Sequence, residues 1–339
     1  MQELWRTRFL LAWAVPLVAT AAAWHSPLAA WIAMLLVHLT VALCEQVPAL
    51  RHSPPAAPAG HFDALVLRGY VLMQAGMLAV GVSVALRPET GWVELLLLGI
   101  AMGSVSGGQG ITFAHELGHS KSRLDRLLGW LLMGSVNYAH FMVEHYRGHH
   151  PRAATEDDPA SARAGESLWR FLPRTLIGSL RSAWVLEHRQ LVRLGRGWHR
   201  SPLVWATLAQ AAWLLLLWRG LGAGAALFWL LQSAQAVFML ETINYIEHYG
   251  LKRRIVGGQR EGFGVMHAWN ADHFVTNAVL VNLQRHSDHH MHAWKPYATL
   301  QPLPGPQLPT GYAGCLYLAC VPPLWFRLMR PRLAALPAG

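Results

Sequence analysis

Long apolar runs alternate along the chain with short polar turns and with long basic loops. Six runs approach the length of about 20 residues that a helix needs to cross a lipid bilayer. They lie at roughly 8–25, 29–47, 64–86, 92–114, 203–219 and 224–246. The connections inside the three successive pairs, HSPL, RPETG and RGLGAG, are short and carry turn residues. The pattern predicts an all-α integral membrane protein whose six transmembrane helices form three hairpins.

Composition and charge agree with this pattern and add an orientation. The chain is 53% hydrophobic and 14% charged, whereas a soluble protein averages about 25% charged residues. This excludes a soluble helical enzyme. The three short connections hold only Arg87 and Arg219 of the 28 Lys and Arg residues. Because basic residues accumulate in cytoplasmic loops, we expect both termini on the cytoplasmic side, with a helical cap formed by 115–202 and 247–339. The whole chain, 1–339, is expected to be one domain.

Four smaller features complete the outline. The first apolar run follows two arginines, as the apolar part of a signal peptide does. However, the sequence ATAAAWHSP leads directly into the second apolar run, so we expect a retained membrane anchor. The stretch 166–197 mixes Trp, Leu and Arg at helical spacing, which suits helices at the membrane interface. The apolar run 311–329 is interrupted by Pro322 and Pro323, so we expect a re-entrant or interfacial helix. The net charge of +10 comes without a nucleic-acid-binding module, so no nucleic-acid partner is expected.

Nine of the nineteen histidines stand in four tight groups, at the predicted cytoplasmic ends of the spans or just beyond them. HELGHS supplies two, EHYRGHH three, NYIEHYG one and LQRHSDHH three. In chain order they are His115, His119, His145, His149, His150, His248, His286, His289 and His290. Chance scattering of surface histidines does not produce such groups in one membrane protein. We therefore interpret the nine as metal ligands.

Helical geometry predicts how these groups share metal ions. His115 and His119 are four residues apart, so they point to one side of a helix and can bind one ion. By the same rule His145 and His149 bind one ion, while His150 turns away by about 100° toward a second. HSDHH is expected to behave likewise. Nine imidazoles exceed the four ligands or so of a zinc site and fit two ions. Imidazole suits Fe, Zn, Cu and Ni, so the spacing leaves the metal open.

The four histidine groups also carry a family resemblance. HELGHS, EHYRGHH, NYIEHYGL and LQRHSDHH resemble the boxes of the integral-membrane alkane 1-monooxygenases. The wider group contains xylene monooxygenases, fatty-acid desaturases and sterol hydroxylases. The resemblance covers residues 107–331 and includes HAWNADH and LPTGYAG, while the first spans are similar only in hydropathy.

This resemblance implies a non-haem di-iron centre, with two Fe ions held by the nine histidines and no bridging carboxylate. It implies six spans around a hydrophobic channel, in a bacterial-type inner (cytoplasmic) membrane with the metal site on the cytoplasmic side. The implied reaction is the O₂-dependent hydroxylation of the terminal methyl group of a medium- or long-chain n-alkane to a 1-alkanol. The implied electron donor is rubredoxin, itself reduced by rubredoxin reductase. Membrane lipid surrounds the protein.

Several other side chains are candidates for supporting roles. Imidazole ligands need an acceptor for their outer nitrogen, and four carboxylates adjoin ligand histidines. These candidates are Glu116, Glu144, Glu247 and Asp288, and His273 joins them. We expect His140, His267 and His292 to be further supporting or surface residues.

His38 stands apart because it falls within the second span, where an ionisable side chain is costly and often functional. It lines the substrate channel in one interpretation. In the other it is a neutral histidine hydrogen-bonded between helices. The basic residues Arg152, Lys252, Arg253, Arg254 and Arg260 either attract an acidic electron carrier or form an ordinary solvated loop.

Other functions stay open at this point. Ser120 stands where the alkane enzymes usually have Lys, and the stretch 253–266 diverges from them. Both departures leave room for a related hydroxylase or desaturase acting on aryl-methyl, terpene or fatty-acyl substrates. H-E-x-x-H alone would indicate an intramembrane zinc protease, but the chain has no Asp-Gly dipeptide to supply the usual third ligand. A membrane metal carrier or sensor is a further alternative.

Overall fold

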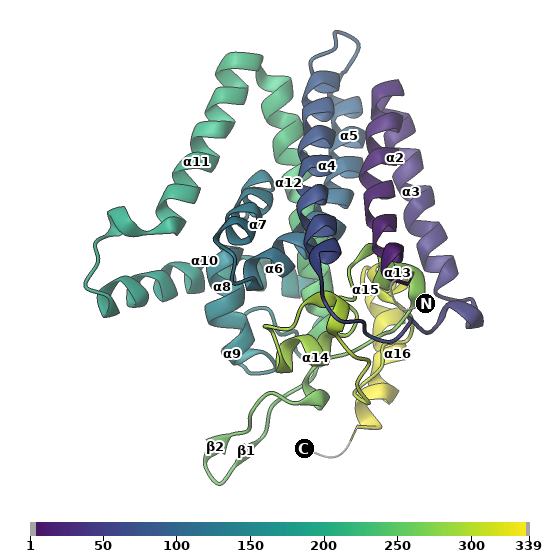
Figure 1. Ribbon diagram of the computed structural model, residues 1–339, viewed down its shortest axis with the longest axis vertical. Helices are drawn as coiled ribbons and strands as arrows, with labels where there is room; N and C mark the ends of the chain where they lie inside the picture. The colour runs from purple at the N-terminus through teal and green to yellow at the C-terminus, as the bar shows by residue number, and fades with distance from the viewer. Residues whose placement is uncertain (1–4, 337–339) are drawn as a thin grey trace.

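The protein is helical almost throughout, as seen in a computed structural model that describes residues 5–336 (Figure 1). Six helical segments in this range are long and apolar enough to cross a membrane. They are Thr7–His25, Pro27–Cys44, His61–Ala85, Trp92–His119, Pro202–Leu221 and Ala223–His248. The prediction of an all-α protein with six spans is thus confirmed.

Each span is built from one or more helical elements. Their bounds are η1 (Thr7–Leu10), α2 (Leu11–His25), α3 (Pro27–Cys44), α4 (His61–Ala85), α5 (Trp92–Val105), η3 (Ser106–Gly110), α6 (Ile111–His119), α11 (Pro202–Leu216), η6 (Leu217–Leu221) and α12 (Ala223–His248). In Figure 1, α2 to α5 and α12 stand together, while α11 slants away from them. Only 11% of the apolar window of α11 is buried, so its apolar side chains would face lipid.

The close approach of α5 to α12 rests on small residues. A Cβ atom at Gly103 would stand 2.5 Å from the carbonyl oxygen of Gln232. One at Gly107, in η3, would stand 2.6 Å from that of Ala236. Only glycine lets the two backbones pack this closely, as small residues do at helix contacts in membranes. This contact fixes the fourth span against the sixth, and both spans end in histidines of the predicted site.

The fourth span extends further than the sequence suggested. We expected it to end at about residue 114, but α5, η3 and α6 form one continuous helical segment up to His119. Its middle is a π turn, in which the amide of Ile111 donates to the carbonyl of Ser106. In this span 78% of the apolar window is buried. His115 and His119 therefore sit on the span itself.

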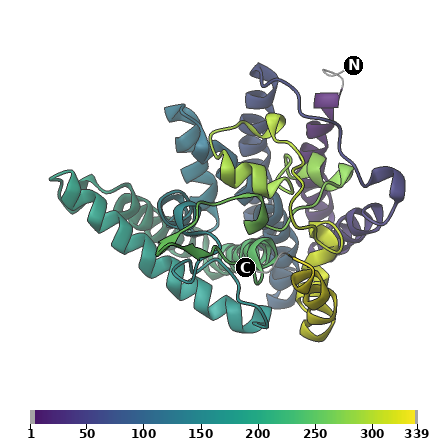
Figure 2. The same ribbon diagram turned by 90° about the horizontal axis from the view of Figure 1, so that it is seen from below.

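The remaining elements gather at one end of the bundle, apart from α7, which packs against α6. They are η2 (Pro48–Leu50), α7 (Arg123–Ser135), α8 (Phe141–Glu144), η4 (His145–His149), α9 (His150–Arg152), α10 (Leu168–Arg193), η5 (Trp198–Arg200), β1 (Ile255–Val256), β2 (Gln259–Arg260), η7 (Val265–His267), α13 (Phe274–Val279), α14 (His286–Met291), η8 (Tyr297–Thr299), α15 (Tyr312–Ala319) and α16 (Pro322–Ala334). The stretch 166–197 forms mainly the single helix α10, and the run 311–329 breaks just before Pro322. Viewed from that end, the segments around α14 lie across the bundle (Figure 2).

Buried polar contacts hold these irregular segments in place. The Arg285 guanidinium, whose side chain is fully buried, donates to Asp272 and to the carbonyls of Leu300 and Pro54. At the end of α3, the Glu45 carboxylate accepts from the Thr276 hydroxyl on α13 and from backbone amides that open α15. Because buried polar groups need partners, these contacts specify one arrangement of loops that have no regular structure of their own. Arg285 directly precedes α14, so it helps to place that helix.

Candidate metal centre

The nine predicted histidines converge in space as two groups. The five-histidine group contains His115, His119, His145, His150 and His289, and the four-histidine group contains His149, His248, His286 and His290. Within each group the chosen ring nitrogens lie within 4.8 Å of one another. Members come from α6, η4, α9, α12 and α14, so the centre exists only when these distant elements are folded together.

The division between the two groups differs from the sequence expectation at one box. We expected His145 and His149 to share an ion and His150 to turn away. Instead His145 and His150 lie in the five-histidine group, and His149 lies in the four-histidine group. The cause is a π turn, in which the amide of His150 donates to the carbonyl of His145. A π turn brings residues five apart onto one face, whereas an α turn aligns residues four apart.

The inner ring nitrogens have the surroundings of metal ligands. The Nε2 atom of His150 lies 2.9 Å from Nε2 of His145 and 3.1 Å from Nε2 of His119. In the other group, Nε2 of His286 lies 3.2 Å from Nε2 of His248. Neutral imidazoles cannot all donate to one another, and a bound cation relieves this crowding of lone pairs.

Further ring nitrogens in the groups are buried and unpaired. Within residues 5–336, both nitrogens of His115, His289 and His290 and the Nε2 atom of His149 have no hydrogen-bond partner. Burial lowers the pKa of His145, His150, His286, His289 and His290, and neighbouring histidines lower it further. These rings are therefore neutral and offer lone pairs. The donor set thus fits metal ions, which would satisfy the unpaired nitrogens.

In the four-histidine group, protein acceptors lie close to the outer nitrogens of three rings. Nδ1 of His149 lies 2.9 Å from the Asp158 carboxylate, and Nδ1 of His248 donates to the carbonyl of His267 at 3.1 Å. Nδ1 of His286 lies 3.3 Å from Glu247. Burial alone would lower the pKa of His149, but the Asp158 carboxylate outweighs it and raises that pKa. These neighbours orient three of the four rings with Nε2 pointing inward.

Asp158 was missed by the sequence reasoning, which considered only carboxylates adjacent to ligand histidines. It lies in the loop after the EHYRGHH box and also accepts from the Ser161 hydroxyl. The acidic pair Asp157 and Asp158 was a signal that a carboxylate follows the box within a short distance. Which of the two carboxylates contacts His149 depends on how the loop folds, and in the structure it is Asp158.

The five-histidine group has fewer such partners. Glu116 Oε1 lies 3.6 Å from Nδ1 of His115 and 3.8 Å from Nδ1 of His289, which is longer than a hydrogen bond. Glu116 is thus near two ligand candidates, as expected for an orienting group, and it is buried.

Two expected supporting residues, Glu144 and Asp288, bond to other groups. Glu144 accepts from Arg152, and burial raises its pKa to about 7. Asp288 accepts from His292, Lys295 and the amide of Gln301. These contacts correct our expectation that both carboxylates face ligand histidines, because neighbours along a helix point in different directions.

The other histidines outside the two groups have separate surroundings. The amide of His273 donates to the side chain of Gln284. The ring of His140 packs on Tyr138, with 4.1 Å between centroids. The carbonyl of His267 accepts the hydrogen bond from Nδ1 of His248, while Nε2 of the His267 ring lies 3.1 Å from Glu261.

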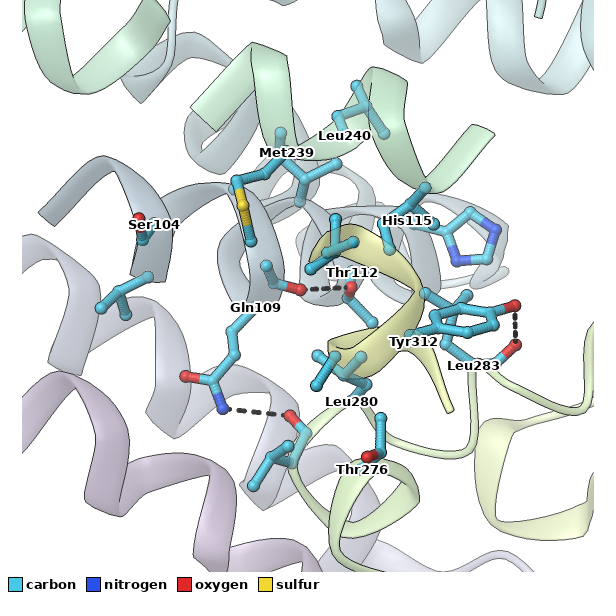
Figure 3. A pocket seen from close by; sticks show the side chains of 18 of the residues that line it. Ser104, Gln109, Thr112, His115, Met239, Leu240, Thr276, Leu280, Leu283 and Tyr312 are labelled. Carbon is cyan, nitrogen blue, oxygen red and sulfur yellow. Dashed lines mark hydrogen bonds between the residues drawn. The ribbon is translucent and has the colours of Figure 1, made fainter. Parts of the chain in front are cut away.

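One cavity connects the membrane part to both groups. His115, His145 and His286 line one part of it, and His38 lines another. Figure 3 shows that Ser104 and His115 lie on opposite sides, with Leu280 and other apolar side chains between. Most lining residues are apolar, which is typical of a site for a hydrophobic ligand.

The surroundings of His38 decide between the two interpretations given for it. Its Nδ1 lies 2.7 Å from the carbonyl of Met34, one turn earlier on the same helix. The expectation of a histidine hydrogen-bonded between helices was therefore wrong, since this bond stays within α3. The ring lines the cavity, as the channel interpretation requires.

Comparison with known proteins assigns the chain to a family. The sequence model of the fatty acid desaturase family matches residues 90–315, which include all nine histidines. The chain is 43% identical to alkane 1-monooxygenase 1 of Pseudomonas aeruginosa over 274 residues, covering 79% of this chain and 71% of the relative. It is 40% identical to alkane 1-monooxygenase 2 of the same organism, covering 84% and 77%. The chain belongs to the alkane 1-monooxygenase family.

The chain is also similar to a more distant monooxygenase. The hydroxylase component of xylene/toluene monooxygenase from Pseudomonas putida is 27% identical over 242 residues, covering 69% of this chain and 63% of the relative. As a member of the alkane 1-monooxygenase family, the protein is an oxidoreductase and a multi-pass membrane protein with a histidine centre able to bind metal. The resemblance read from the four boxes is confirmed.

Proposed function

We propose that this protein hydroxylates the terminal methyl group of medium- or long-chain n-alkanes to give 1-alkanols, with O₂ as co-substrate. One observation carries the proposal: both histidine groups line the same mostly apolar cavity. An alkane offers no polar handle, so only an apolar cavity that ends at reactive groups can position its methyl group. The relatives named alkane 1-monooxygenases support this substrate class.

The nine histidines would hold two Fe ions, one in each group, within a single domain formed by residues 1–339. A pair of irons bound there would supply the activation of O₂, and with two electrons from the donor and two protons one oxygen atom would enter the C–H bond and the other would leave as water. The protein itself would position the substrate and exclude water from the site. Leu280 and Leu283 line the cavity, so their side chains would guide the chain end and exclude water. Asp158, Glu247 and the His267 carbonyl would keep the rings aimed inward, and Glu116 would assist in the other group.

His38 is proposed to limit how far an alkane enters. It lines the cavity together with Val37 and Val41 of the same helix. His38→Leu gives a shorter, apolar side chain and His38→Phe a larger one, so the distribution of product chain lengths should shift in both variants. Unchanged product profiles would refute this role.

The electron donor is proposed to be rubredoxin, reduced by rubredoxin reductase. Lys252, Arg253 and Arg254 directly precede the protruding hairpin of β1 and β2, and Arg260 lies in β2 (Figure 1). The half-buried Phe263 follows this hairpin, and its ring stacks on His290 with 4.7 Å between centroids. A basic hairpin that leads to a ligand candidate suits an acidic electron carrier. Arg152, Lys252 and Arg254 have lesser parts in this proposal, because they pair with the carboxylates of Glu144, Glu156 and Glu261.

The protein is proposed to lie in a bacterial inner membrane, with the histidine end and both termini in the cytoplasm. The support is the bias of basic residues, because only Arg87 and Arg219 of the 28 Lys and Arg residues fall in the short connections within the span pairs. The connection between α4 and α5 lies at the end of the bundle away from α14 (Figure 1). A soluble electron carrier could then reach the hairpin.

A second candidate is hydroxylation of aryl-methyl groups, favoured by the xylene/toluene monooxygenase relative. The zinc-protease alternative loses support, because three further histidines gather with His115 and His119, which exceeds the usual ligand number of zinc.

The test combines metal counting with turnover. The purified protein is analysed for metal per chain, then supplied with reduced rubredoxin, O₂ and n-alkanes from octane to hexadecane. About two irons per chain, as the two histidine groups imply, and a 1-alkanol product are expected. About one zinc per chain without O₂ consumption would overturn the proposal. Parallel reactions with p-xylene and a fatty-acyl substrate separate the related hydroxylase and desaturase activities.

A further inference from the structure

A second cavity adjoins the first on the side away from the histidine groups. It lies between α3, α5, α12 and α15. Trp31, Leu35 and Phe238 give it a largely apolar lining. His38 and Ser104 line both cavities, so they mark the place where the two spaces meet. We call His38, Ser104 and Gln235 the polar junction, since Gln235 of α12 also lines the second cavity.

The hydrogen bonds fix which atoms of His38 are available at this junction. A backbone carbonyl only accepts, so the Nδ1 atom of His38, 2.7 Å from the Met34 carbonyl, must carry a proton. A neutral ring then has a bare acceptor at Nε2, and within the membrane the charged ring is strongly disfavoured. Among the residues that the structure describes, no group hydrogen-bonds this Nε2 atom.

The other two residues of the polar junction also leave an acceptor free. The Ser104 hydroxyl donates to the Ile100 carbonyl at 2.8 Å, so it can only accept from Gln235. Gln235 accordingly presents its amide nitrogen to Ser104, at 3.2 Å. This leaves Oε1 of Gln235 as a second acceptor without a partner in the described part of the chain. An acceptor in an apolar cavity is costly unless a donor reaches it.

We infer that the polar junction binds the hydroxyl group of a straight-chain primary alcohol, whose methyl end reaches the histidine groups. The inference rests on the proposed function and extends its substrates from n-alkanes to 1-alkanols. The hydroxyl group would donate to Nε2 of His38. A carboxylate lacks a proton to donate, and an alkane leaves the acceptor unpaired, so the junction distinguishes alcohols from both.

The geometry and the stoichiometry are consistent with this assignment. Ser104 and His115 lie 11 positions apart on one helical segment, or about 16 Å at the helical rise. A chain that spans this length has its two ends in different surroundings. In the reaction, the 1-alkanol and O₂ take up two electrons from the rubredoxin-class donor and two protons. One oxygen atom enters the terminal C–H bond to give the α,ω-diol, and the other leaves as water.

The first experiment compares substrates on the unaltered protein and needs no turnover. Displacement of radiolabelled dodecane is measured without O₂ or reductant, using 1-dodecanol and 1-methoxyundecane, which has equal length and no donor. The alcohol is expected to bind about tenfold more tightly, the effect of one hydrogen bond. Equal affinity for the two compounds would overturn the inference.

The second experiment removes the acceptor. In His38→Leu the alcohol-to-ether affinity ratio should fall about tenfold, and the ratio of diol to dodecanol formation should fall with it. His38→Gln, which can place an amide oxygen near the position of Nε2, should restore both ratios. Leu39→Ala is the matched control, because this neighbour is 41% exposed on the outside of α3 and should keep both ratios.

The outcomes separate this inference from the proposed function. If dodecane is hydroxylated but His38→Leu keeps the preference for alcohol, the polar junction is wrong and the proposed function stands. If neither compound is oxidised, the proposed function fails, while the displacement measurement still decides the polar junction. Should His38→Leu fail to fold, His38→Phe removes the same acceptor while keeping a ring, and an unchanged affinity ratio in that variant would also contradict the inference.

Discussion

The four-histidine group and the five-histidine group differ in what holds the outer nitrogen of each ring. In the four-histidine group, Asp158, the His267 carbonyl and Glu247 stand 2.9 to 3.3 Å from three of the Nδ1 atoms. In the five-histidine group, Glu116 is more than 3.5 Å from the two rings it approaches. The smaller group thus has fewer ligands, and three of them have an acceptor close to the outer nitrogen. The larger group has more ligands, and the acceptor near its outer nitrogens stands farther away. We expect the smaller group to depend more strongly on each of its members.

The largest effect is expected from loss of a ligand in the smaller group. His290→Ala leaves three imidazoles there, whereas His119→Ala leaves four in the other group. His290→Ala should lose one of the two irons and at least about 100-fold of the hydroxylation rate, because its site keeps too few ligands. His119→Ala should retain more iron per chain. Elemental analysis checks this, with His140→Ala as the control, and equal iron loss in both variants would contradict the comparison.

Removal of a partner of the outer nitrogen should have the next largest effect. Asp158→Asn cannot accept the His149 Nδ1 proton as a carboxylate does, so iron affinity should fall about 10- to 100-fold. Competition with a chelator measures this. Asp288→Asn is the matched control, because Asp288 adjoins His289 in sequence but bonds to His292 and Lys295. Similar losses in the two variants would show that the distinction drawn from the hydrogen bonds is wrong.

The looser support of the five-histidine group predicts a smaller effect. Glu116→Gln should lower alkane hydroxylation by no more than about tenfold, since no hydrogen bond to a ligand candidate is broken. Initial rates of 1-alkanol formation check this. Complete loss of activity with normal iron content would instead indicate that Glu116 handles a proton in the reaction.

The smallest effect concerns electron entry beside the four-histidine group. Arg260→Glu on the hairpin should slow reduction by rubredoxin several-fold at low ionic strength, because one exposed charge mainly changes the encounter rate. The difference should disappear at high salt. Stopped-flow reduction measures it, and Arg219→Glu at the opposite end of the bundle should be unaffected. A salt-independent rate in the unaltered protein would exclude docking by these charges.

The spans and the set of histidines were predictable because each leaves a local signal. An apolar run long enough to cross a bilayer can only be helical there, so hydropathy located all six spans. Clustering in sequence likewise identified the nine histidines that gather in space.

The assignment of histidines to groups was not predictable, because π turns leave no comparable signal. The turn at His145 reversed the places of His149 and His150, and the turn at Ser106 carried the fourth span on to His119. Asp158 and Arg285 act through contacts between segments distant in sequence or through an irregular loop. Such contacts depend on the completed fold, and no local pattern specifies them.

The most direct test of the account is an anomalous scattering map of crystals of the purified protein, recorded at the iron absorption edge. The account predicts two iron peaks per chain, one within the five-histidine group and one within the four-histidine group. A single peak, or a signal at the zinc edge in place of iron, would contradict it.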